Sequence, residues 1–184
     1  LTLASPMDEC ELRRLMYTAQ LPGKGTFVIR YPRGKGVRTD WHCPFEEVQV
    51  GTARTLCEGT DVAVLSYGPL GNDVQQAIKE LNSEGCTLSV AHYDLRFAKP
   101  LDEHLLGNVA QRFKRIVTIE DGARAGGIGS AGLEWMSDHG FAPQMTRLGL
   151  PDKFVEHGTV AQLRQIVGLD IQSIKNAIKG ESHP

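Results

Sequence analysis

Short runs of apolar, β-branched residues alternate with amphipathic stretches along most of this 184-residue chain. Such runs are typical of strands that are buried on both faces of a sheet. Stretches in which apolar residues recur every three or four positions are typical of helices that cover a sheet. The pattern therefore predicts a protein in which strands and helices follow one another in turn.

The regular part of this pattern begins near Val48. Strands are predicted at 48–57, 61–67, 86–92, 116–119 and 143–148, and helices at 72–83, 102–113, 131–138, 159–167 and 170–178. The first strand turns back at Glu58-Gly59, so we expect it to be an antiparallel edge strand. The prediction is an α/β fold: a mostly parallel sheet of about five strands with one antiparallel edge strand, and helices on both faces.

A smaller unit precedes this region. It consists of a predicted helix at 7–20 and a predicted strand at 26–31. The following stretch, 37–47, is mixed and polar with Pro44 inside it, which is typical of a linker between domains. The sequence thus predicts the end of one domain at 1–36, a linker at 37–47 and a second domain at 48–184, with a loose tail at 180–184.

A glycine-rich loop separates the strand at 116–119 from the helix after it. Its glycines let backbone N–H groups approach a partner closely, and the helix N-terminus carries partial positive charge. The expected partner is a phosphate, a carboxylate or another strand. Ser130 is the predicted N-cap of this helix, and Asn72 is the predicted N-cap of an earlier one.

The string from Gly127 to Gly132 matches the dinucleotide pattern GxGxxG. In a dinucleotide fold the pattern follows its first strand directly, whereas here six residues separate Glu120 from Gly127 and the strand comes late in the domain. We therefore do not predict an NAD site. The favoured interpretation is that small residues let the helix pack tightly on the sheet or on a second subunit.

Composition narrows the possible partners. Hydrophobic residues make up 41% and charged residues 23%, and the formal net charge is -2, so neither nucleic acid nor a membrane is an expected partner. The N-terminal residues lack the basic and apolar regions of a signal peptide. Because the chain starts with Leu1, we expect it to be a piece of a longer protein.

The cysteines do not indicate a site. No two of the four have CxxC spacing, and they are read as reduced thiols of a cytosolic protein: Cys10, Cys43, Cys57 and Cys86. His42 beside Cys43 is not predicted to act with it. The sequence also lacks the motifs of zinc peptidases, calcium loops and phosphate-binding loops.

Arg33 is a candidate anion-binding residue. It lies between Pro32 and Gly34 just after a predicted strand, and its guanidinium can donate two hydrogen bonds to a phosphate. From chemistry alone, a solvated arginine in a linker is the favoured alternative. Arg30 and Arg38 are close in sequence and could share or replace the role.

Other polar residues follow the predicted strands. Arg96 and Lys99 come after one strand, where ligands bind in open α/β sheets. A local ion-pair network that also involves Asp94, Asp102 and Glu120 is the favoured interpretation. His157 is expected to be structural, and Ser66 and Ser130 lack the GxSxG setting of a hydrolase nucleophile.

Taken together, strings in this order resemble one enzyme family. They are PMDE at 6–9, RYPRG at 30–34, LSYG at 65–68, DLRFAKPLD at 94–102, GGIGS at 126–130, GLPDKF at 149–154 and HG at 157–158. The chain resembles the 1-deoxy-D-xylulose-5-phosphate synthases over almost its whole length. It departs from them at Ala98, where valine is usual, and at Asp121-Gly122, where Glu-Asn is common.

The resemblance implies a transketolase-like homodimer in the bacterial cytoplasm that depends on thiamine diphosphate and Mg²⁺. Such an enzyme condenses pyruvate with D-glyceraldehyde 3-phosphate, releases carbon dioxide and feeds isoprenoid, thiamine and pyridoxal synthesis. It has three α/β domains. By this resemblance, 1–36 is the end of the second, pyrimidine-binding domain, and 48–184 is a transketolase C-terminal-like domain.

The resemblance also implies which residues act. Arg33 would contact the phosphorylated substrate, whereas no residue of this chain would be catalytic or bind a metal. The magnesium motif, the activating glutamate and the catalytic histidines would lie upstream. The isolated fragment is therefore expected to be inactive and to bind neither thiamine diphosphate nor Mg²⁺. For Gly126–Gly129 the resemblance leaves packing and subunit contact as the expected roles.

Two alternatives remain at this stage. The β-subunit of a 2-oxo acid dehydrogenase, or a transketolase, shares this kind of domain, but each would be expected to lack the RYPRG string ahead of it. A free-standing α/β module that binds an anion or a protein, without chemistry of its own, is the alternative from another class.

Overall fold

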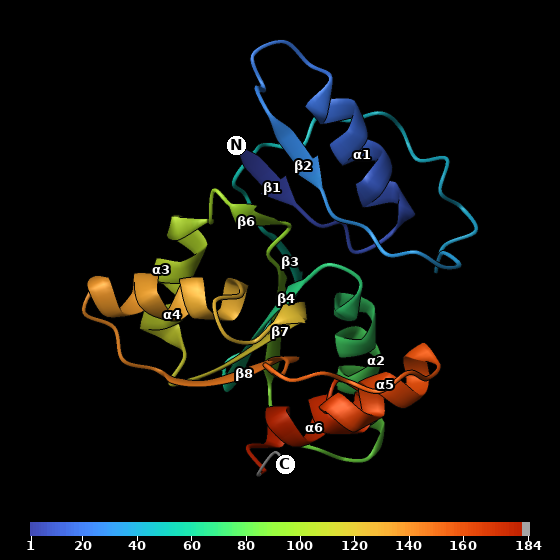
Figure 1. Cartoon of the computed structure of the whole chain (residues 1–184). Helices are drawn as coiled ribbons and strands as arrows, with labels where there is room; N and C mark the ends of the chain where they lie inside the picture. The colour runs from blue at the N-terminus through green and yellow to red at the C-terminus, as the bar shows by residue number, and fades with distance from the viewer. Residues whose placement is uncertain (182–184) are drawn as a thin grey trace.

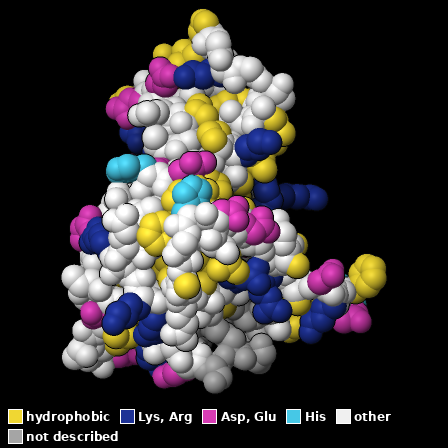
Figure 2. Space-filling model, turned by 90° about the vertical axis from the view of Figure 1, so that its left-hand side faces the viewer, with side chains coloured by type: hydrophobic (Ala, Val, Ile, Leu, Met, Phe, Trp, Pro, Cys, Tyr) yellow, Lys and Arg dark blue, Asp and Glu magenta, His cyan; other side chains and the backbone are white. Residues whose placement is uncertain are grey.

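Two lobes make up the chain in the computed structural model, which describes residues 1–181 (Figure 1). The smaller lobe holds a three-stranded sheet and one helix, and the larger lobe holds a five-stranded sheet between helices. Of the tail that is predicted to be loose, residues 182–184 lie outside the described residues. Figure 2 shows the side that carries the α3 (Glu103–Arg112) and α4 (Ile128–Asp138) helices, where acidic and basic side chains are interspersed.

The sheet of the larger lobe confirms the predicted fold class. Its strands are β3 (Arg54–Cys57), β4 (Val62–Tyr67), β5 (Val90–Asp94), β7 (Arg115–Ala123) and β8 (Gln144–Leu150). They lie in the order β3-β5-β4-β7-β8, with β3 antiparallel to its neighbour and every other pair parallel. The edge strand β3 pairs with β5, although β4 follows it in the chain.

Helices cover both faces of this sheet (Figure 1). α3 and α4 lie on one face, and α2 (Leu70–Ser83), α5 (Val160–Val167) and α6 (Ile171–Lys179) lie on the other. Successive side chains of a strand point to opposite faces. Val62 and Val64 of β4 therefore pack with α2 and α6, while Ala63 and Leu65 pack with α3 and α4. The two apolar clusters bury both faces, as the continuous apolar runs predict.

The smaller lobe contains two strands, at 2–4 and 97–99, that are not predicted from the sequence. It consists of β1 (Thr2–Ala4), α1 (Glu9–Ala19), β2 (Phe27–Ile29) and β6 (Phe97–Lys99). β1 lies between a parallel β2 and an antiparallel β6. No strand is predicted between 92 and 116, yet 97–99 forms one. These residues form a strand because β1, far away in the sequence, supplies its hydrogen-bond partners.

Three predicted boundaries or caps also need correction. The strands predicted from 48 and from 86 begin only at Arg54 and Val90. Val48 instead packs in the apolar core of the smaller lobe. Asn72 does not cap α2, which begins earlier, at Leu70; its side chain donates to the carbonyls of Met7 and Pro69.

Other helix starts agree with the sequence. Asp102, Thr159 and Asp170 each accept a hydrogen bond from a backbone N–H in the first turn of the helix that follows. These caps depend on residues three positions apart, so a local pattern is enough to predict them. Across residues 1–181, no helix has both the length and the apolar character needed to cross a membrane.

Candidate functional site

A groove of about 690 Å³ lies between the two lobes. Its wall in the smaller lobe is the start of α1 and the loop 31–38, and its wall in the larger lobe includes the start of α2 and part of α5. Tyr31, Arg33, Lys35 and Trp41 line it on one side and Arg164 on the other. The groove thus combines aromatic surface with several cations.

Arg33, the predicted anion-binding residue, lies in this groove and is exposed. Within residues 1–181 its guanidinium makes no ion pair and no hydrogen bond to the protein. Lys35, two positions later, is also exposed and lines the same groove. An anion that enters the groove would meet these two charges without displacing an acidic side chain.

The two other candidate arginines are held elsewhere. Arg30 donates to the backbone carbonyl of Asp121 in the larger lobe. Arg38 donates from Nε to Oδ1 of Asp40 at 3.0 Å, and its Nη1 lies 3.6 Å from Oδ2 of Asp8. The hydrogen bonds from Arg38 lower the pKa of Asp40. Both arginines therefore hold the loop in place, whereas Arg33 is free to bind a ligand.

Arg164, unlike Arg33, has an acidic partner that balances its charge in the groove. Its Nη1 lies 2.7 Å from Oδ2 of Asp73, which joins α5 to α2. Burial raises the pKa of Asp73, and the charge of Arg164 opposes that shift. Because Arg38 and Arg164 are both paired with carboxylates, Arg33 and Lys35 are the exposed cations of the groove that have no ion pair among residues 1–181.

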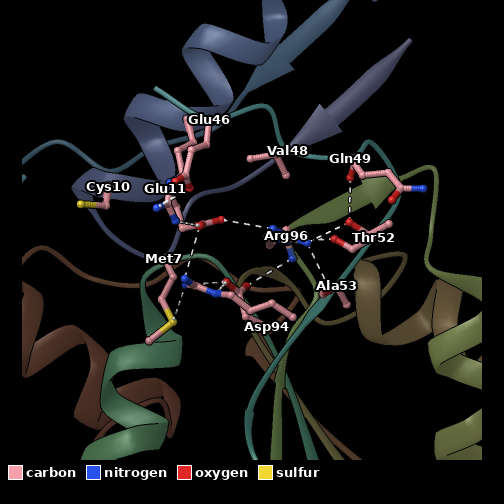
Figure 3. A network of polar contacts seen from close by, with 12 residues as sticks. Met7, Cys10, Glu11, Glu46, Val48, Gln49, Thr52, Ala53, Asp94 and Arg96 are labelled. Atoms are coloured by element: carbon pink, nitrogen blue, oxygen red, sulfur yellow. Dashed lines mark hydrogen bonds and ion pairs between the residues drawn. The ribbon is translucent and has the colours of Figure 1, made fainter. Parts of the chain in front are cut away.

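A buried network of charges joins the lobes beside this groove (Figure 3). Arg54 Nη1 lies 3.3 Å from Glu11 Oε1 of the smaller lobe, and Arg54 Nη2 lies 3.0 Å from Asp94 Oδ2 of the larger lobe. Arg96 donates to the carbonyl of Thr52 at 2.8 Å and lies 3.8 Å from Glu11 Oε2. The structure confirms the predicted ion-pair network for Asp94 and Arg96.

The acidic side chains of this network are almost completely buried. The side chains of Glu11 and Asp94 are 2% and 0% exposed. Burial raises the pKa of Asp94 to about 6, against the opposing charge of Arg54. Arg96 has a φ of 56°, a conformation that non-glycine residues rarely adopt. Buried carboxylates and a positive φ at Arg96 are both unfavourable in free energy. They persist only where the surrounding packing holds them, so we infer that this packing fixes the joint between the lobes.

At the glycine-rich loop, the partner of the helix terminus is a carboxylate of the protein itself. Glu120 accepts hydrogen bonds from the N–H groups of Ile128 and Gly129, both at 3.0 Å. The N-cap of α4 is Gly127, so the predicted capping role of Ser130 is wrong; the Ser130 hydroxyl donates to the carbonyl of Arg124. Glu120 acts here as a cap and not in the predicted ion-pair network.

The small residues of this loop pack against the sheet. A Cβ on Gly129 would lie 2.4 Å from Thr118 Oγ1 of β7. This close approach confirms the interpretation that glycine lets the helix pack tightly on the sheet. The N–H groups that would hold a diphosphate at such a terminus already bind Glu120, so the loop does not fit a dinucleotide or thiamine diphosphate.

Sequence reasoning missed a buried Ser–His pair below the joint. Ser66 Oγ lies 2.8 Å from His92 Nε2, and both residues are buried completely. Burial, and then the charge of Arg54, lower the pKa of His92 to about 4. A pair sealed from solvent cannot meet a substrate, so its role is structural. His157 and Lys99 are exposed and belong to neither cluster.

The chain does not supply an evident metal centre. In the part of the chain that the structure describes, no three His, Cys, Asp or Glu side chains come together in a way that would hold a metal ion. The features that stand out are thus a groove lined by exposed cations and a buried joint, and residues 1–181 show no constellation of nucleophile, base and metal.

Proteins that are similar to this chain are several times longer than it is. The family model described as transketolase, C-terminal domain, matches residues 51–174. A 1-deoxy-D-xylulose-5-phosphate synthase of Bacteroides thetaiotaomicron is 60% identical over 174 residues, which are 95% of this chain and 27% of the relative. One of Aquifex aeolicus is 38% identical over 181 residues, 97% of this chain and 28% of the relative.

A solved structure also shares the fold. It is titled split gene transketolase, inactive beta4 tetramer, and it superposes with a TM-score of 0.83 at 25% identity. The match covers 97% of this chain and 57% of the other. The chain spans about a quarter of the length of the curated relatives and just over half of this transketolase chain.

Proposed function

Because the chain belongs to the family of transketolase C-terminal domains, we propose that it is the C-terminal part of a 1-deoxy-D-xylulose-5-phosphate synthase. The family match begins at residue 51, and the residues ahead of it contain the RYPRG string and the smaller lobe's wall of the groove. Identity of 60% over 95% of the chain to a synthase supports this assignment over other thiamine-dependent enzymes.

The proposed reaction joins pyruvate to D-glyceraldehyde 3-phosphate with loss of carbon dioxide. Thiamine diphosphate, when bound with Mg²⁺, supplies the nucleophilic carbon for this chemistry. Glu120 occupies the one glycine-rich helix terminus that resembles a phosphate site, and residues 1–181 offer no metal cluster. We therefore assign both groups to the remainder of the enzyme and expect this chain to bind neither.

Arg33 is the residue of this chain that we assign to the substrate. The observation that carries this assignment is an exposed guanidinium in the groove between the lobes, without an acidic partner in the described part of the chain. A hydrogen bond to a charged group contributes about 1.5–3 kcal/mol. Loss of that contribution corresponds to about a 10- to 150-fold weaker binding of the phosphate.

The test is Arg33→Ala in the full-length protein. We expect the KM for D-glyceraldehyde 3-phosphate to rise about 10-fold or more, with an unchanged KM for pyruvate, which carries no phosphate. Lys114→Ala, which removes an exposed cation from outside the groove, is the matched control and should change neither constant. An unchanged KM for the aldehyde phosphate in Arg33→Ala would reject the role.

The rest of the chain serves packing and assembly in this proposal. Residues 1–36 end the pyrimidine-binding domain, 37–47 link it onward, and 48–184 form the C-terminal domain of a homodimer. The transketolase relative is titled as an inactive beta4 tetramer of a split-gene enzyme, which supports self-assembly and a lack of activity for such a partial chain. The purified 184-residue chain should show no turnover with both substrates and both cofactors.

The location follows from the same proposal. We place the enzyme in the bacterial cytoplasm, without nucleic acid or membrane as a partner. Cys10, Cys43, Cys57 and Cys86 are all free thiols in the structure, which supports a reducing compartment. Fractionation of cells that produce the full-length protein would test it, since recovery in the membrane or the periplasm would contradict the assignment.

A further inference from the structure

We propose that Glu9 is a positioning residue for the phosphorylated substrate, because its carboxylate fixes the loop that presents Arg33. The inference rests on the proposed function of Arg33 and adds a second residue to it. Glu9 also lines the groove, but both of its carboxylate oxygens accept hydrogen bonds from the loop, so this role needs no contact with the substrate. Its role would be to limit where Arg33 can reach.

The first observation is a pair of hydrogen bonds. Glu9 Oε1 accepts from the N–H of Val37 at 2.8 Å, and Glu9 Oε2 accepts from the N–H of Arg38 at 3.0 Å. Both oxygens of one carboxylate are thus used on two consecutive backbone groups. Hydrogen bonds to a charged acceptor are about twice as strong as neutral ones, so this contact holds the end of the loop firmly.

The second observation is the space that the loop leaves for this carboxylate. A Cβ on Gly36 would lie 1.8 Å from Glu9 Oε1, far closer than any real contact. Gly36 does not adopt the left-handed conformation, so its lack of a side chain matters here for space and not for backbone freedom. Gly36 therefore allows Glu9 to reach the two N–H groups.

The third observation concerns the two ends of the loop. At its start, the N–H of Arg30 donates to the carbonyl of Ala4 at 2.8 Å, which ties the loop to β1. At its end, Glu9 holds Val37 and Arg38 as described. Residues 31–36 between these anchors are all exposed and include Arg33. An exposed segment has many conformations, and two fixed ends reduce their number before a ligand binds.

The base of this contact is itself rigid. Glu9 is the first residue of α1, which Asp8 caps by accepting from the N–H of Glu11 at 2.9 Å. Glu11 then enters the buried network with Arg54 and Arg96. Glu9 therefore connects the loop of Arg33, through the first turn of α1, to the buried joint between the lobes.

The experiment uses the full-length protein with three single variants. Glu9→Ala should raise the KM for D-glyceraldehyde 3-phosphate about 5-fold or more. Without this anchor the loop 31–36 has more conformations before the substrate binds, and restricting them reduces the free energy of binding. Gly36→Ala should act in the same direction, since its methyl group displaces the carboxylate. Glu9→Gln, which keeps one acceptor, should lie between. The KM for pyruvate should not change, and Glu134→Ala, at an exposed site on α4, is the control.

A double-mutant cycle separates this inference from the one on which it rests. If Glu9 acts through Arg33, then Glu9→Ala should add nothing further to the KM once Arg33→Ala is present. Additive effects, or an unchanged KM in Glu9→Ala beside a raised KM in Arg33→Ala, would overturn the positioning role alone. An unchanged KM in Arg33→Ala would overturn both. Urea unfolding of Glu9→Ala shows whether the fold is intact, and a fold defect alone would produce no coupling.

Discussion

Individual polar residues in this chain owe their properties to where the fold buries them. His92 is fully buried and its Nε2 has one partner, Ser66. Its Nδ1 has no hydrogen-bond partner among the described residues. Protonation would place a charge in this enclosed site next to Arg54, and the pKa of His92 is therefore lowered to about 4.

This burial makes stability depend on pH. Between about pH 6.5 and 4 the unfolded chain binds a proton at His92 that the folded chain does not, so the free energy of unfolding falls as the pH falls. We expect the wild-type chain to lose about 2 kcal/mol more than His92→Gln between pH 7 and pH 5. Urea unfolding at the two pH values measures this difference.

Asp94 has the opposite sign in an overlapping range. Its pKa is raised to about 6, so the folded chain binds more protons than the unfolded chain below that pH, and this contribution grows as the pH falls. It is present in both the wild type and His92→Gln and so cancels in the comparison. His157→Gln, at an exposed histidine, should behave as the wild type; equal losses in the wild type and His92→Gln would contradict the prediction.

Among the elements, α4 depends on a single carboxylate for its start. No side chain of its own first turn caps it, and Glu120 from the end of the buried part of β7 supplies both acceptors. The negative charge also lies at the positive end of the helix dipole. One residue thus couples a strand, a loop and a helix.

Glu120→Ala should therefore lower the free energy of unfolding by about 1–3 kcal/mol, because two buried N–H groups lose their acceptor. Glu120→Gln, which keeps one acceptor oxygen, should cost less. The urea midpoint of the 184-residue chain measures both. Glu134→Ala, an exposed glutamate of α4 itself, is the control, and equal midpoints for the two alanine variants would contradict the capping role.

At the scale of the whole molecule, the two lobes are held together by shared strands and by buried charge. β6 leaves the larger lobe to pair with β1, and Glu11 enters the joint to meet Arg54 and Arg96. Without Glu11, Arg54 would keep only Asp94, and Arg96 would lose the one carboxylate within ion-pair distance of it among residues 1–181. A buried cation that loses its partner is costly. The joint should therefore be sensitive at Glu11.

We expect Glu11→Ala to lower the free energy of unfolding by about 3–5 kcal/mol and to speed proteolysis between Val50 and Arg54, where the chain passes from the smaller lobe to β3. Urea unfolding and limited proteolysis measure the two effects. Glu46→Ala removes an exposed partner of Arg14 and should cost no more than about 1 kcal/mol. A Glu11 variant as stable as the Glu46 variant would show that the network does not hold the lobes.

The sequence alone determined the α/β class, the antiparallel edge strand and the starts of the helices at Asp102, Thr159 and Asp170. It also singled out Arg33, through the string around it, as the residue to test. These features depend on the side chains of near neighbours: an apolar run has two buried faces, and a cap acts within one helical turn. Such information is complete within a short stretch of chain.

Only the tertiary structure decided which partner each polar group has. It selected a carboxylate among three possible partners for the glycine-rich helix terminus, turned 97–99 into a strand beside β1, and brought Glu9 to the N–H groups of Val37 and Arg38. The separations range from eight residues to more than ninety. No local pattern specifies such pairs, because they form only when packing brings distant segments within hydrogen-bond distance.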